Sequence, residues 1–151
     1  MRILFPALLL LLSACNNVQP IGNDTDTVQG NFADTTLSPG TRPIRIGENG
    51  PGFAACAING TVATLPDNGT LPLRTAPFSD AKQIAVLQPG RKLFICTRSM
   101  DQRWLGVVVR PATGEPDQDC GVSARLDSPR DYAGPCASGW VANAFVQFTA
   151  D

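Results

Sequence analysis

The chain has 151 residues, of which 12 are Lys or Arg and 13 are Asp or Glu, and it contains no histidine. The near-neutral balance argues against a nucleic-acid-binding protein, which needs a basic surface. The lack of histidine excludes the common Ser–His and Cys–His nucleophilic arrangements and removes the usual nitrogen ligand of zinc. We therefore expect neither an enzyme nor a metalloprotein, and no cofactor.

An apolar run follows the positively charged amino end at Met1 and Arg2 and stops just before Cys15. The run has about ten residues, whereas a membrane-spanning helix takes roughly 20, so its length is typical of a signal-peptide core. The sequence "LSAC" at residues 12–15 resembles the lipobox of bacterial lipoproteins. In that family the cysteine is acylated and becomes the first residue of the mature chain.

The lipobox resemblance implies a lipid anchor. Residues 1–14 would be removed as a signal peptide, and Cys15 would carry acyl chains that hold the protein at a membrane. Residue 16 is Asn rather than Asp, which in many Gram-negative bacteria favours the outer membrane, so we expect the protein to face the periplasm there. The alternative is ordinary secretory cleavage after Ala14, which would leave Cys15 as a free thiol.

Residues 15–43 have the composition of a flexible tether. They are rich in Asn, Asp, Thr, Gly and Pro and show neither helical nor strand periodicity. As a flexible coil, a segment of this length has an end-to-end distance of about 30 Å. Docking of an apolar tether residue such as Val28 or Phe32 on the folded domain is the alternative.

From about residue 44 the chain changes to short runs of β-forming residues separated by turn signals. The expected strands are 57–65, 71–74, 83–87, 92–98, 103–110 and 139–141. No window shows a convincing apolar period of 3.6 residues, so we expect few helices. Many short strands with frequent turns predict an all-β fold, either a small barrel or a sandwich.

Two stretches resemble the bacterial SH3-like family. "LPLRTAPFSDAKQIAVLQPGRKLFIC" resembles its opening half, and "GWVANAFV" resembles its closing signature, in which Gly-Trp-Val is followed by a one-turn helix and a last short strand. The resemblance implies a small SH3-like barrel within a domain at 44–151. The chain departs from the family pattern at Ala76, where Gly is usual, and in an insert at about 111–138, which could cover a binding groove.

Four cysteines remain after Cys15, and we expect all of them to be oxidised: Cys56, Cys96, Cys120 and Cys136. Disulfides persist in exported proteins, and no two of these cysteines form the C-x-x-C motif typical of metal or redox sites. Four cysteines allow three connectivities. Of these we favour Cys120–Cys136, which closes the insert on itself, and Cys56–Cys96, which ties the segment before the barrel to a central strand.

Charge separates the central strands from the insert. Residues 71–110 contain seven basic and two acidic side chains, a net charge of +5, whereas residues 111–138 contain two basic and five acidic ones, a net charge of −3. A basic face favours an anionic envelope polymer as partner, unless the acidic insert folds over the basic strands and neutralises them. A carboxylate pair such as Glu115 with Asp117 or Asp119 is a weaker catalytic or calcium candidate, because its surroundings are typical of a solvated loop.

The candidate binding residues combine cationic and aromatic character on loops and strand ends: Arg74, Phe78, Arg103 and Trp104. Trp140 in "GWV" is expected to pack inside the fold, whereas Trp104 could be packed or exposed. The sequence thus predicts a non-catalytic binding module that recognises peptidoglycan or its peptide stems. The alternative is a protein-docking adaptor or an accessory subunit of an envelope assembly.

Overall fold

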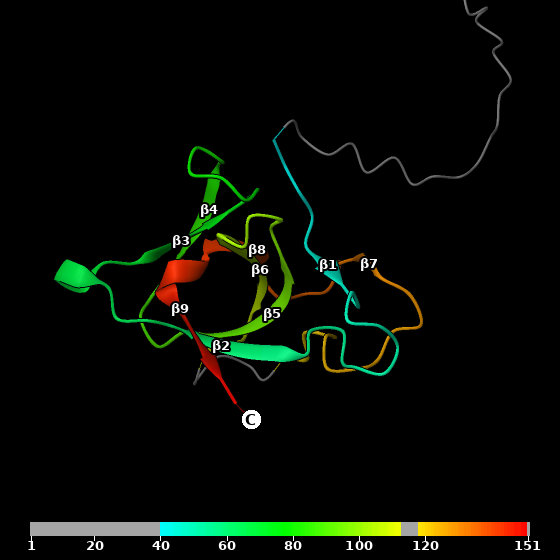
Figure 1. Cartoon of the computed structure of the whole chain (residues 1–151). Coiled ribbons are helices and arrows are strands. Elements are labelled where there is room, and N and C mark those ends of the chain that lie inside the picture. The colour runs from blue at the N-terminus through cyan, green and yellow to red at the C-terminus, as the bar shows by residue number, and fades with distance from the viewer. Residues whose placement is uncertain (1–39, 113–117, 151) are drawn as a thin grey trace, which may run out of the picture. The chain divides into compact units, whose positions relative to one another are not determined.

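The computed structural model describes residues 40–112 and 118–150 (Figure 1). The expected signal peptide at 1–14, the lipidated Cys15 and most of the expected tether lie outside the described residues. Within the described part no helix is long and apolar enough to cross a membrane.

The fold is all-β, as the sequence predicts. Its strands are β1 (Arg45–Ile46), β2 (Ile58–Val62), β3 (Leu71–Arg74), β4 (Gln83–Leu87), β5 (Lys92–Arg98), β6 (Trp104–Val109), β7 (Arg130–Asp131), β8 (Ser138–Ala142) and β9 (Val146–Thr149). Two short 3-10 turns, η1 (Pro66–Asn68) and η2 (Asn143–Phe145), complete the described elements. Seven strands form one antiparallel sheet in the order β4-β3-β8-β6-β5-β2-β9, and β1 pairs with β7.

The strand predictions hold well for β3, β4, β5 and β6. β3, β4 and β5 have the predicted bounds, and β6 is one residue shorter at each end than the predicted 103–110. The 3-10 turn η2 and strand β9 follow "GWV" as the SH3-like resemblance implies. β1 and β7, of two residues each, have no periodic signal and were not predicted.

The large sheet curls around one apolar core. Its inner face contributes buried side chains from all seven strands, including Val62, Leu73, Leu93, Val107 and Val146. Because a flat sheet cannot bring residues from both edge strands into one cluster, the sheet must bend strongly, as in a small barrel (Figure 1). The edge strands are β4 and β9.

A second apolar cluster, called the outer cluster here, lies on the opposite face of the sheet. Along β6, Leu105 and Val107 point into the inner core, whereas Val108 belongs to the outer cluster, which explains why this strand is buried on both faces. The outer cluster contains Ile44, Ile46, Ala55, Cys56, Cys96, Val108, Cys120, Val122 and Trp140. Two segments therefore cover this face: residues 44–56 and the insert.

The two covering segments are hydrogen-bonded to each other. Ala55 N donates to Ala124 O at 2.8 Å, Cys56 N donates to Val122 O at 3.0 Å, and Tyr132 N donates to Ile44 O at 2.8 Å. Gly106 of β6 makes room for the close packing beneath them. A Cβ atom there would clash with Thr97 Cγ2 and lie 3.1 Å from Ile44 Cδ1.

Both favoured disulfides are present. Cys56 is bonded to Cys96 of β5, and Cys120 is bonded to Cys136. The first bond fastens the segment before β2 to the outer face of the sheet, and the second closes the insert. The connectivity predicted from the sequence is therefore confirmed.

Candidate binding surface at the end of the β5–β6 hairpin

The turn that joins β5 to β6 is held by a compact network of hydrogen bonds. The Ser99 hydroxyl donates to Asp101 Oδ1 and accepts a hydrogen bond from Trp104 N at 3.0 Å. Asp101 Oδ1 also accepts a hydrogen bond from Arg103 N at 3.1 Å, and Ser99 N donates to Trp104 O at 3.0 Å. Short polar residues that bond to nearby backbone in this way fix a turn in one conformation.

The carboxy-terminal 3-10 turn η2 holds the same hairpin end from the other side. Asn143 N donates to Arg103 O, and Asn143 Nδ2 donates to Gln102 O, both at 2.9 Å. Gln102 has a φ of 58°, a left-handed conformation that non-glycine residues seldom adopt and that the two hydrogen bonds from Asn143 help to hold. The hairpin end is therefore a preorganised part of the surface.

Asp101 is ionised at neutral pH. The Ser99 hydroxyl and then the Arg103 backbone N–H lower the pKa of this carboxyl below its ordinary value of 3.8, because both donate to the charged form. Since the pKa is lower in the folded state, the stabilisation is present above pH 3.8 and is lost as the pH falls through the folded-state pKa.

We expect the hairpin end to loosen in acid before the rest of the sheet does. Amide hydrogen exchange of Arg103 and Trp104 should accelerate as the pH falls below 3.8, beyond the change in intrinsic exchange rate, while the amides of residues 105–109 in β6 stay protected. Asp101→Ala should give the faster exchange already at neutral pH. Equal protection of the turn in both proteins would contradict the role given to Asp101.

The rigid hairpin end presents a cation, an aromatic ring and an apolar side chain together. Arg103 is exposed, Met100 is 97% exposed, and Trp104 is half-buried with its packed side against the outer cluster. Trp104 is therefore both packed and accessible, which resolves the alternative that the sequence left open. A guanidinium forms bidentate hydrogen bonds with carboxylates, and an aromatic face packs against flat apolar surfaces.

Arg74 and Phe78 form a separate pair at the end of the β3–β4 hairpin. Arg74 Nη1 donates to Ala81 O at 2.8 Å, so the guanidinium fastens the loop that carries Phe78, whose side chain is exposed. Arg74 lies opposite Trp140, and Trp104 lies opposite Ala142 two residues along the same strand. The four sequence-predicted residues thus form two pairs on either side of β8, rather than one continuous set.

Arg42 is a surface cation that the sequence analysis missed because it lies within the expected tether at 15–43. Its guanidinium lies 5.1 Å from the centroid of the Trp140 ring, and its carbonyl accepts a hydrogen bond from Trp140 Nε1 at 2.8 Å. Its N–H donates to Thr75 O at 2.9 Å. The folded domain therefore includes residues 40–43, and Arg42 adds positive charge over β8, between the two pairs.

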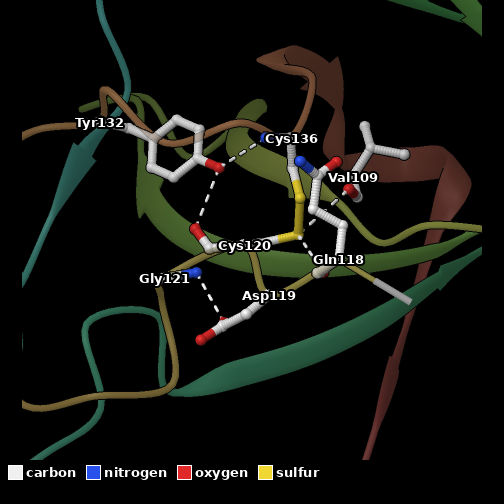
Figure 2. Close-up of a disulfide and its surroundings, with 7 residues drawn as sticks. All are labelled: Val109, Gln118, Asp119, Cys120, Gly121, Tyr132 and Cys136. Atoms are coloured by element: carbon white, nitrogen blue, oxygen red, sulfur yellow. Dashed lines mark hydrogen bonds between the residues drawn. A yellow bond between two sulfur atoms is a disulfide. The ribbon is translucent and has the colours of Figure 1, made fainter. Parts of the chain in front are cut away.

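The insert covers the middle of the outer face but leaves the hairpin end accessible. Figure 2 shows the Tyr132 hydroxyl between its two disulfide-bonded ends: it donates to Cys120 O at 3.1 Å and accepts from Cys136 N at 3.0 Å. Burial raises the pKa of Tyr132 above 10.0. This bridge and the disulfide explain how an irregular segment keeps one conformation.

Two acidic side chains of the insert bond to groups outside the basic strands. Asp131 forms its ion pair with Arg45 at 3.5 Å, and Asp119 Oδ1 accepts a hydrogen bond from Gly121 N at 2.8 Å (Figure 2). Apolar residues such as Val122 anchor the insert on the outer cluster. Residues 113–117, which contain Glu115 and Asp117 of the weaker carboxylate candidate, lie outside the described residues.

Among residues 40–112 and 118–150, no group of three or more potential metal-ligating side chains lies together. Comparisons of the chain with family models, with curated proteins and with solved structures find no match.

Proposed function

We propose that the chain is a lipid-anchored, non-catalytic binding module of the bacterial cell envelope that recognises peptidoglycan or its peptide stems. The observation that carries this proposal is the rigid β5–β6 hairpin end, which presents exposed Arg103 beside half-buried Trp104. The lipobox-like "LSAC" supports the location, since it implies acylation of Cys15.

The geometry suits an anionic, partly flat ligand. Peptide stems end in carboxylates, which a guanidinium binds in a bidentate manner, and sugar rings offer flat faces to an indole. Because hydrogen bonds already fix the turn, binding there costs little additional ordering of the protein. A contact guided by charge should also weaken as ionic strength rises through physiological values.

A protein-docking adaptor is the second candidate function, and strand β4 favours it. β4 is an edge strand without charged residues, and it exposes Ile84 and Val86 at 47% and 49%. An uncharged apolar edge can accept an extended segment of another protein as an additional strand.

Arg103→Glu is expected to weaken binding to purified sacculi at least tenfold, because it replaces a charge-assisted hydrogen bond by repulsion. The measurement is co-sedimentation of the chain from residue 15 onward with Cys15→Ser. Arg125→Glu is the matched control, since Arg125 is exposed on the insert and the charge change is the same. Trp104→Ala should also weaken binding, with some loss of melting temperature because this side chain packs on the outer cluster.

Equal binding by wild type and Arg103→Glu would contradict the proposed role of the hairpin end. If Arg125→Glu weakens binding as strongly, the interaction depends only on net charge. The adaptor is favoured if the wild-type chain captures an envelope protein, if Val86→Lys abolishes this capture, and if the chain does not sediment with sacculi.

A further inference from the structure

A second cationic site lies on the outer face of the sheet, just beyond the far end of β6. There Thr61 of β2 pairs with Lys92 of β5, and Arg110 N donates to Lys92 O at 3.1 Å. Two residues before Thr61 in β2, Asn59 pairs with Thr149 of β9. Since directly paired residues share one face of a sheet, β2, β5 and β9 place Lys92 and three hydrogen-bonding side chains together, next to Arg110 just after β6.

The guanidinium of Arg110 is held in a fixed position. Its Cζ lies 4.1 Å from the centroid of the Phe94 ring, and its Nη2 donates to Asn59 Oδ1 at 2.8 Å. Arg110 Nε is buried and has no hydrogen-bond partner among the described residues. Stacking on an aromatic face and one fixed hydrogen bond leave the remaining N–H groups of the fork preorganised for a further acceptor.

These side chains surround a small open pocket. It has a volume of about 160 Å³, and its polar lining includes Asn59, Thr61, Lys92, Arg110 and Thr149. A water molecule occupies about 30 Å³ of liquid, so the pocket admits a carboxylate group with part of its hydration, but not a folded peptide.

The surrounding strands supply no counter-charge. β2, β5, β6 and β9 contain neither aspartate nor glutamate in their sequences INGTV, KLFICTR, WLGVVV and VQFT. Two neighbouring cations repel each other, and an anion bound between them relieves this repulsion.

We propose that Lys92 and Arg110 form a carboxylate-binding subsite, with Thr61 and Thr149 as additional hydrogen-bond donors. The ligand class is the free carboxylate of a short peptide or an amino acid, so the identity of the physiological ligand rests on the proposed recognition of peptide stems. Arg110 lies about 20 Å along β6 from Trp104 by the rise of a strand, so the subsite is separate from the hairpin end.

The test is an NMR titration of the oxidised chain from residue 15 onward with Cys15→Ser. Sodium acetate gradually replaces sodium chloride at constant ionic strength. A parallel titration uses inorganic phosphate in place of acetate. Acetate should give saturable shifts of the backbone amides of Thr61, Lys92, Arg110 and Thr149. Lys92→Gln should weaken acetate binding about tenfold, as expected for the loss of one charge-assisted hydrogen bond, and Lys82→Gln, at an exposed lysine outside the pocket, should not.

Arg110→Lys separates guanidinium recognition from charge alone. It keeps the charge but loses the planar fork, so acetate binding should fall while the spectrum remains that of the folded protein. Shifts that rise linearly with acetate and do not saturate would overturn the subsite, as would an equal effect of Lys82→Gln. Tighter binding of phosphate would overturn the assignment to carboxylates.

The subsite and the proposed function fail in different ways. If acetate does not bind but Arg103→Glu still abolishes sedimentation on sacculi, only the subsite is wrong. If acetate binds at Lys92 and Arg110 while sacculi never sediment the protein, the subsite stands and the proposed recognition of peptidoglycan is wrong.

Discussion

Replacing Cys56 and Cys96 together by alanine is expected to lower the free energy of unfolding by about 4 kcal/mol. The bond joins residues 40 apart in sequence, so it removes considerable chain entropy from the unfolded state. Alanine is used rather than serine because both cysteines are only 4% exposed in the outer cluster, where serine would bury a hydroxyl group. Urea unfolding of wild type and the double variant, followed by tryptophan fluorescence, measures the difference.

The Cys120→Ala, Cys136→Ala pair is the matched comparison. Its sequence separation is only 16, so the entropy model gives about 3 kcal/mol and a milder effect on the sheet. The Cys56→Ala, Cys96→Ala variant should also release residues 44–56 from the outer face, which faster hydrogen exchange of the Ile46 amide would reveal. A larger loss from the shorter loop would contradict the entropic explanation, and free thiols in the wild type would contradict the disulfides themselves.

Trp140→Ala is expected to cost about 3–5 kcal/mol, the range for removing a large aromatic side chain from a packed core. Trp140 is fully buried in the outer cluster, and its indole N–H is satisfied by Arg42 O. Trp140→Phe keeps most of the packing but loses this hydrogen bond, so it should cost less. Thermal and urea unfolding of both variants test whether Trp140→Ala lowers the free energy of unfolding more than Trp140→Phe does.

Trp104→Ala provides the internal contrast for this prediction. Trp104 is only half-buried at the edge of the same cluster, so its removal should cost clearly less than that of Trp140. If Trp104→Ala unfolds the protein as readily as Trp140→Ala does, Trp104 belongs to the core, and the hairpin end loses its aromatic contact surface.

The strands were predictable because their signal is local. Buried Leu71 and Leu73 alternate with half-buried Pro72 and Arg74, and Pro89 with Gly90 marks the turn before β5. The packing of Trp140 was also predicted correctly, although it lies on the outer rather than the inner face. The expected export and the even number of cysteines left after Cys15 predicted that all four are oxidised, and the favoured one of three possible connectivities is the one observed.

The outer cluster was not predictable in the same way. Ile44 and Val122 lie in irregular segments without a strand or helix period, and they meet only because distant parts of the chain fold onto β6. The role of Arg74 in fastening its own loop depends on one hydrogen bond to Ala81 O, which no sequence pattern indicates. Composition alone placed Arg42 in the tether, although its backbone is bonded to Thr75 and Trp140.

The most direct test of recognition by the hairpin end is an NMR map of the chain with soluble peptidoglycan fragments that carry peptide stems. We predict saturable shifts of the amides of Arg103 and Trp104 and of the Trp104 indole N–H, and we expect Arg103→Glu to abolish them. Shifts confined to β4 or to the insert, or no shifts at high fragment concentration, would contradict recognition by the hairpin end.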